Sequence, residues 1–175
     1  MTSKRTQIGI IFLTIFIDMV GFGIVIPILP RYAEHYGATT MQIGWLAGIF
    51  SLMQFIFAPV WGKVSDRIGR KPLLFISTLG TAAGFYIMGS ASTLAFLFAG
   101  RIVDGISGGN IGVAQAYIAD ITEPAERSKA MGLIGAAFGL GFIFGPALGG
   151  WVASHYGFGA PMYVAAAMAL INAVL

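Results

Sequence analysis

The sequence contains no cysteine and carries very little charge. Without cysteine, the chain has neither disulfides nor thiol chemistry. Charged residues make up only 10% of its 175 residues, and 57% are hydrophobic. In a soluble domain about a quarter of the residues are charged. These proportions, with a mean hydropathy of +0.85, exclude an ordinary soluble domain and favour an integral membrane protein.

Residues that carry chemistry are also scarce. Histidine occurs only at His35 and His155, both in expected outer loops, and no residues have the spacing of metal ligands. We therefore expect no enzyme, no metal and no cofactor. The net charge of +3 follows from basic residues in loops and does not indicate a nucleic-acid partner.

Apolar segments long enough to cross a bilayer recur along the chain. A spanning helix needs about 20 apolar residues. Pro27 and Pro30 are expected to end the first helix, and the sixth reaches Leu175 in mid-span. We thus expect an all-α membrane protein with six helices, the sixth truncated, at approximately residues 8–28, 43–61, 73–88, 94–117, 131–152 and 160–175.

Basic residues fall almost entirely on one side of this predicted arrangement. Cytoplasmic loops of membrane proteins are enriched in Lys and Arg. Arg31 alone falls on the opposite side, and Arg101 lies within a span. The others share the side of the N-terminus: Lys4, Arg5, Lys63, Arg67, Arg70, Lys71, Arg127 and Lys129. The pattern predicts a multi-pass protein of the cell membrane with a cytoplasmic N-terminus.

Charge is most concentrated in residues 62–71, which read Gly-Lys-Val-Ser-Asp-Arg-Ile-Gly-Arg-Lys. Apolar segments on both sides predict a short polar loop between the second and third helices. Gly62 and Gly69 would let the chain turn tightly at its two ends. Asp66 precedes Arg70 by four residues, the spacing at which side chains pair on one helical turn.

Three charged residues, Asp18, Arg101 and Asp104, lie inside predicted spans. Each costs about 2.5–3.5 kcal/mol at a helix centre on insertion scales, so such residues are functional candidates. Because a low dielectric disfavours the charged form of a carboxylate, Asp18 is a candidate for binding and releasing a proton near neutral pH. The alternative is a carboxylate that pairs with a neighbouring helix and never titrates.

The fourth predicted helix has a polar face lined with small residues. A continuous helix of 100° per residue places the following on one face: Arg101, Asp104, Gly105, Gly108, Gly112 and Gln115. We expect this face, including Gln115, to line a water-filled cavity. An ion pair between Arg101 and Asp104 at i,i+3 is the structural alternative. Asn110 lies on the opposite face and is expected to pack or to bridge helices.

The fifth predicted helix carries two faces of glycine, which let helix backbones approach closely. One face holds Gly141, Gly145 and Gly149, and the other holds Gly132, Gly135, Gly139 and Gly150. Pro146 is expected to bend the helix. Residues 57–62 and 144–149 have similar sequences at the ends of the second and fifth helices. That similarity is expected of an inverted three-plus-three repeat, with chance as the alternative.

Four segments of the chain together resemble the major facilitator superfamily. Residues 62–71 match its G-x-x-x-D-R-x-G-R-[KR] signature between helices two and three, and residues 97–109 resemble its helix-four motif. Residues 141–150, Gly-Phe-Ile-Phe-Gly-Pro-Ala-Leu-Gly-Gly, are similar to the helix-five motif of the proton-driven drug antiporters. Residues 18–30 resemble their first-helix pattern.

Within that superfamily the sequence is most similar to the tetracycline efflux proteins, notably in residues 100–103 and 116–122. It departs from them in helix three, where residues 82–88 include no acidic residue. The resemblance therefore implies drug-type antiport without implying tetracycline as the substrate.

The resemblance implies the N-terminal six-helix half of a twelve-helix transporter, built as two inverted three-helix repeats, with the C-terminal half absent. A proton gradient would drive export of amphipathic small molecules by alternating access. The implied partners are the bilayer, the small-molecule substrate, and the missing half or a second copy. Import of a metabolite or sugar on the same fold, and a half-domain that does not transport, are the alternatives.

The resemblance also implies roles for named residues. Arg70 would pair with Asp66 and with Asp120, and so hold the cytoplasmic side shut in the outward-open state. Arg101 would support proton coupling. The antiporter motif of helix five, here Gly141, Gly145, Pro146, Gly149 and Gly150, would shape that helix.

Overall fold

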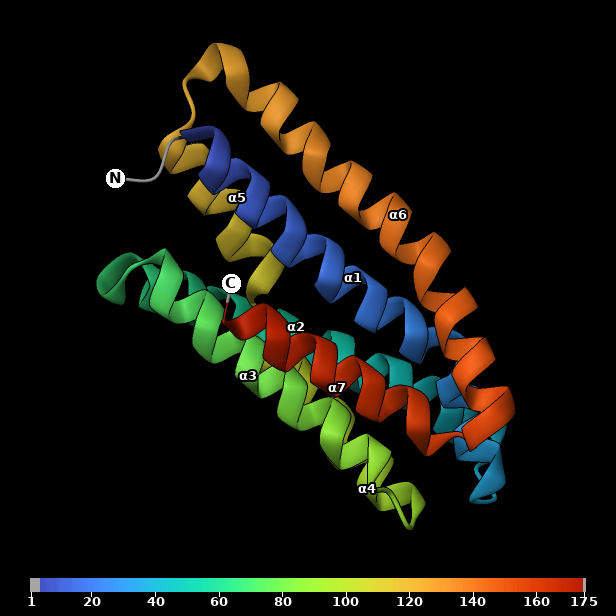
Figure 1. The fold of residues 1–175 in the computed structure, drawn as a ribbon. Helices are drawn as coiled ribbons and strands as arrows, with labels where there is room; N and C mark the ends of the chain where they lie inside the picture. The colour runs from blue at the N-terminus through green and yellow to red at the C-terminus, as the bar shows by residue number, and fades with distance from the viewer. Residues whose placement is uncertain (1–3, 175) are drawn as a thin grey trace.

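The chain folds into a bundle of long helices (Figure 1). The computed structural model describes the backbone of residues 4–174 and the side chains of residues 6–174. Within these residues there are helices and no strand: α1 (Lys4–His35), α2 (Thr40–Ile68), α3 (Arg70–Gly89), α4 (Leu94–Ser107), α5 (Asn110–Ile121), α6 (Pro124–Tyr156) and α7 (Gly159–Ala173). The predicted all-α fold is confirmed.

Of the described helices, four are long and apolar enough to cross a membrane, namely α1, α2, α3 and α6, and α7 is a shorter apolar helix. The start of α1 and the α2–α3 and α5–α6 connections lie toward one end of the bundle, and the α1–α2, α3–α4 and α6–α7 connections lie toward the opposite end (Figure 1). The path alternates as the basic residues predict. The side chains of Lys4 and Arg5 lie outside the described residues.

The first helix does not end at its prolines, contrary to the expectation. Pro27 and Pro30 lie inside α1, which continues to His35. The last turns are anchored by burial, since Tyr32 and Ala33 are 5% and 0% exposed. This packing outweighs the helix-breaking cost of about 3 kcal/mol for a proline. The chain turns instead at Gly37, whose φ of 74° suits glycine.

The charged segment 62–71 is helical and is not the predicted loop. Gly62 lies within α2, which extends to Ile68, and α3 begins at Arg70. A single residue separates the two helices: Gly69, with a φ of 96°. The predicted loop at residues 120–129 is also short, because α5 runs to Ile121 and α6 begins at Pro124.

The fourth predicted helix is interrupted where we expected a continuous one. Ser107 ends α4, and Asn110 begins α5. The break frees backbone carbonyls inside the bundle, and side chains of α2 and α3 donate hydrogen bonds to them. Gln54 Nε2 lies 2.8 Å from the Gly108 carbonyl oxygen. Trp61 donates to the carbonyl of Ile106, and Ser77 donates to that of Ser107. The interruption is therefore stabilised by tertiary contacts.

This break interrupts the continuous polar face that the sequence predicts. Before it, Arg101 and Asp104 are buried, whereas beyond it Gly112 and Gln115 are exposed. A rotation of 100° per residue holds only while the helix is continuous, so it does not relate the positions on α5 to those on α4.

Glycines bring α1 and α6 into backbone contact, and Figure 1 shows α6 curving along α1. A Cβ atom added at Gly145 would lie 2.7 Å from the Cα of Gly23. The same face of α6 packs Gly141 on Met19 and Gly149 on Ile24. Close backbone approach of this kind drives helix association in a bilayer.

The second glycine face of α6 does not pack within the described chain. Cβ atoms added there would meet no atom within 4 Å: Gly132, Gly135, Gly139 and Gly150. Of the two glycine faces of α6, one therefore packs on α1 within the described chain and the other is open. Pro146 lies inside α6, which continues past it.

Pairings between the helices follow an inverted repeat. The packing of α1 on α6 has its counterpart in the packing of α4 on α2, and that of α1 on α7 has its counterpart in α4 on α3. The third helix of each triplet, α3 and α7, pack on one another. One triplet is α1, α2 and α3, and the other is α4 with α5, then α6 and α7. Exchanging the two triplets maps the first four of these pairings onto one another and the α3–α7 pairing onto itself, as two inverted three-helix units require.

We expect Gly145→Ala and Gly132→Ala to change stability in opposite directions. At Gly145 the new methyl group overlaps the backbone of α1, which should lower the free energy of unfolding by about 1–3 kcal/mol. At Gly132 the space is open, and alanine should raise the free energy of unfolding by up to about 1 kcal/mol. Thermal unfolding of the purified protein in detergent measures both; equal effects of the two substitutions would contradict this packing.

Candidate functional site

Asp18 lies half-buried near the middle of α1 and is held by two amides from other helices. Asn110 Nδ2, at the start of α5, donates to Asp18 Oδ2 at 2.8 Å. Asn172 Nδ2, near the end of α7, donates to Asp18 Oδ1 at 2.8 Å and to the Thr14 carbonyl oxygen at 2.9 Å. Each carboxylate oxygen therefore has its own donor, and three helices meet at this group.

Sequence reasoning placed only part of this cluster. Asn110 was expected to pack or to bridge helices, and it bridges α5 to α1. The sequence analysis did not identify Asn172 as a site residue. An amide in the otherwise apolar segment 164–175 could have indicated a polar role, but only the packing of α7 on α1 brings Asn172 to Asp18.

Arg101 and Asp104 form a buried ion pair on α4. Arg101 Nη1 lies 3.0 Å from Asp104 Oδ2, and the two residues are 4% and 3% exposed. The guanidinium carbon lies 4.1 Å from the centroid of the Phe50 ring, and Arg101 Nε donates to the Leu46 carbonyl at 3.3 Å. The i,i+3 pairing considered from the sequence is thus the observed geometry. It holds Arg101 against α2 through a cation–π contact and a hydrogen bond.

A cavity of about 230 Å³, here called the central cavity, lies in the bundle, and both Asp18 and Asp104 line it. Its walls are mainly aromatic and aliphatic, with a few polar groups. The lining residues are Asp18, Met19, Phe22, Phe50, Gln54, Thr81, Phe85, Asp104, Gly108, Asn110, Ile111 and Phe138. Apolar walls with few polar groups are typical of small-molecule sites. Of the predicted cavity residues, Asp18 and Asp104 are in this lining, whereas Arg101 and Gln115 are not.

A second cavity of about 370 Å³ is lined by Arg70. It lies between α2 and α5, and shares Gln54, Gly108 and Ile111 with the first. The two cavities therefore adjoin, one at Asp18 and the other at the charged end of the bundle.

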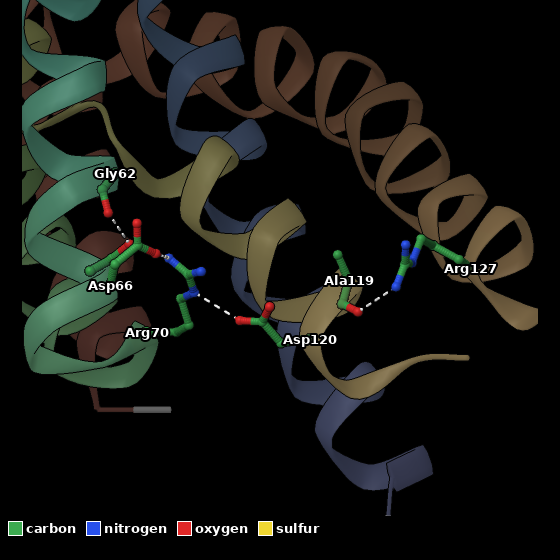
Figure 2. Close-up of polar contacts among 7 residues, drawn as sticks. Gly62, Asp66, Arg70, Ala119, Asp120 and Arg127 are labelled. Carbon is green, nitrogen blue, oxygen red and sulfur yellow. Dashed lines mark hydrogen bonds and ion pairs between the residues drawn. The ribbon is translucent and has the colours of Figure 1, made fainter. Parts of the chain in front are cut away.

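Arg70 is the centre of a charge cluster at that end (Figure 2). Its Nη1 lies 2.7 Å from Asp66 Oδ1, and its Nε lies 2.9 Å from Asp120 Oδ2. It also donates to the Ser65 hydroxyl, which in turn donates to the Gly62 carbonyl at 2.8 Å. One guanidinium thus ties the α2–α3 junction to the end of α5.

The remaining charged residues of this end take other positions. Arg67 and Lys71 are exposed on α2 and α3. Arg127 of α6 donates from Nη2 to the Ala119 carbonyl at 2.9 Å, as Figure 2 shows, and so ties the start of α6 to α5. Within residues 4–174, no group of three or more His, Asp or Glu side chains is placed to hold a metal ion.

Similar proteins are known over nearly the whole chain. A tetracycline resistance protein of class C from Escherichia coli is 42% identical over 165 residues, which are 93% of this chain and 41% of that protein. Multidrug resistance protein 2 of Bacillus subtilis (strain 168) is 37% identical over 174 residues, 98% of this chain and 43% of that protein. The predicted similarity to tetracycline efflux proteins is confirmed.

The fold has a solved counterpart. The crystal structure of the human organic anion transporter MFSD10 (TETRAN) superposes with a TM-score of 0.80 at 29% identity, and the match covers 99% of this chain and 46% of that one. The chain thus spans less than half the length of the proteins it matches, as expected for one half of a twelve-helix transporter. The family model of the Major Facilitator Superfamily matches residues 11–175. This chain belongs to the Major Facilitator Superfamily.

Proposed function

We propose that this chain forms half of a proton-coupled transporter that exports amphipathic small molecules by alternating access. The central cavity supports this most strongly, because it combines aromatic walls with two carboxylates. The printed names of the relatives, tetracycline resistance and multidrug resistance proteins, point the same way.

The charges around the cavity favour a substrate with a positive charge. Asp18 and Asp104 are both in its lining. Arg101 neutralises Asp104 from outside that lining, while Asp18 is held only by neutral amides. A cation with an aromatic body would complement Asp18 and the phenylalanine walls.

Coupling follows if the proton and the substrate compete for Asp18. A cationic substrate stabilises the ionised carboxylate, and a proton that neutralises the carboxylate releases the substrate. The two ligands then occupy the site in turn, and an inward proton gradient drives the substrate outward.

The Arg70 cluster would close the cytoplasmic side. It joins α3 and α2 to α5 by ion pairs that can break and re-form as the bundle opens. We place this end in the cytoplasm of a cell-membrane protein, because the basic residues gather there.

A second half would complete the cavity. Of the 18-residue apolar stretch of α2, only 6% is buried within the chain, and one glycine face of α6 is open. These two faces fit a further six-helix unit, either a continuation of the chain or a second copy. The intact mass of the native gene product distinguishes the two cases.

We expect Asp18→Asn to abolish uphill export. The amide keeps the size of the side chain but cannot take up a proton, so gradient-driven efflux of ethidium from loaded cells should fall at least tenfold, with normal protein levels. The control is collapse of the proton gradient, which should stop efflux by the wild type. Unchanged efflux by Asp18→Asn would move the coupling to another acid.

The same assay tests substrate charge and direction. The cationic dye ethidium should leave the cells faster than the anionic dye calcein, because only the cation complements Asp18. Selective export of calcein would contradict the proposed charge preference. Gradient-dependent uptake without export would favour metabolite import, and no transport by the complete gene product would favour a non-transporting half-domain.

Arg70→Ala should loosen the charged end of the bundle. The substitution removes both ion pairs, each worth about 0–1 kcal/mol at an exposed site. Labelling of a cysteine at Ala116, which lines the second cavity, by an impermeant maleimide in inside-out vesicles should become several-fold faster. Lys63→Ala, an exposed change on α2, is the matched control. Equal labelling rates in all three proteins would refute a closing role for Arg70.

A further inference from the structure

The two amides that hold Asp18 bind it through their nitrogen atoms only, and their oxygen atoms have no hydrogen-bond partner. Asn110 and Asn172 are 7% and 3% exposed, and each donates its N–H group to Asp18. The side-chain oxygens of both residues are buried and accept no hydrogen bond within the described structure. A buried polar atom without a partner lowers stability, so two of them beside one carboxylate call for an explanation.

Carboxyl chemistry gives that explanation. An ionised carboxylate only accepts hydrogen bonds, and both amides present donors to it. A protonated carboxyl group also has one O–H to donate and needs an acceptor nearby. Rotating one asparagine amide by half a turn about its last side-chain bond would exchange its N–H for the oxygen that is now unpartnered.

We infer that Asn110 and Asn172 are positioning residues for Asp18 that serve both of its protonation states. Their N–H groups hold the carboxylate when it is ionised, and the oxygen of one of them accepts the carboxyl O–H when it is protonated. This inference deepens the proposed function, since it assigns how the proton site is held.

Asn110 and Asn172, together called the Asp18 clamp, also join Asp18 to the two helices that meet α1 there. Asn110 is the first residue of α5, directly after the break whose carbonyls are capped by α2 and α3. Asn172 ties α7 to two consecutive turns of α1, through Thr14 and Asp18. A change in the protonation of Asp18 therefore changes hydrogen bonds to both helices at once.

Asp104 is the titratable group that shares the cavity lining with Asp18, and Arg101 is paired with it. The other helices around Asp18 carry their acidic and basic residues near their ends: Lys63, Asp66 and Arg67 on α2, Arg70 and Lys71 on α3, Asp120 on α5, and Glu126, Arg127, Lys129 and His155 on α6. The phenols on these helices are Tyr86 on α3, Tyr117 on α5, Tyr156 on α6 and Tyr163 on α7.

Infrared titration of the complete gene product in detergent tests the clamp without any substrate. The carboxyl C=O band that disappears in Asp18→Asn reports protonated Asp18, and Asp104→Asn identifies the band of the other acid.

Asn172→Leu and Asn110→Leu keep the volume of the side chain and remove the amide. Losing a donor to the ionised form should move the midpoint of the Asp18 band upward by about one pH unit in each variant. Losing the acceptor should raise the frequency of the band in the variant at the position that accepts the carboxyl O–H.

Met168→Leu, one turn earlier on α7, changes packing without touching Asp18 and should leave both quantities unchanged. If a leucine variant does not fold, Asn172→Ser and Asn110→Ser, which shorten the side chain out of reach, are measured in its place with the same expectation. A midpoint and frequency that stay at wild-type values in folded variants at both positions would overturn the clamp. This result is separate from the transport assay, where an unaffected Asp18→Asn would instead overturn the proposed function.

Discussion

The interior of a bilayer contains no water, and this constraint governs where the polar groups of this chain lie. A backbone carbonyl freed by a helix break, or a charge placed in a span, must find its partner inside the protein. At the α4–α5 break, side chains of α2 and α3 supply the missing donors. On α4, Arg101 takes Asp104 and the Phe50 ring as partners. Among the buried side-chain nitrogen and oxygen atoms of residues 6–174, those without a partner are the oxygens of the two asparagines at Asp18.

The two acids of the cavity accordingly differ in their freedom to change charge. Asp104 is neutralised by a guanidinium that stays charged at any physiological pH, so its pairing is a fixed part of the α4 structure. Asp18 has only neutral donors, which can also turn to accept. This difference in partners is the basis of our proposal that the proton binds at Asp18.

Close helix packing gives that site its geometry. Glycines on α6 allow the backbone of α1 to approach to contact distance, which fixes α1 and hence Asp18 against its neighbours. At the charged end, exposed ion pairs of Arg70 provide a weaker connection between α3 and α5. A rigid crossing near the proton site and a breakable link at one end suit a bundle that opens and closes around a fixed centre.

The sequence by itself determined the membrane class, the alternation of the spans and the family. Each depends on local properties, namely apolar length, the side on which basic residues fall, and motif spacing. It also singled out Asp18 and Asp104 as charges inside spans, and it paired Asp66 with Arg70 by their i,i+4 spacing. Asp120 as the second partner of Arg70 came only from the family resemblance. Where the helices end or break could not be read from the chain. Packing of Tyr32 carries α1 past its prolines, and donors from α2 and α3 stabilise the interruption of the fourth span. For the same reason only the tertiary structure places Asn172 beside Asp18, since contacts between residues 154 positions apart depend on how α1 and α7 pack.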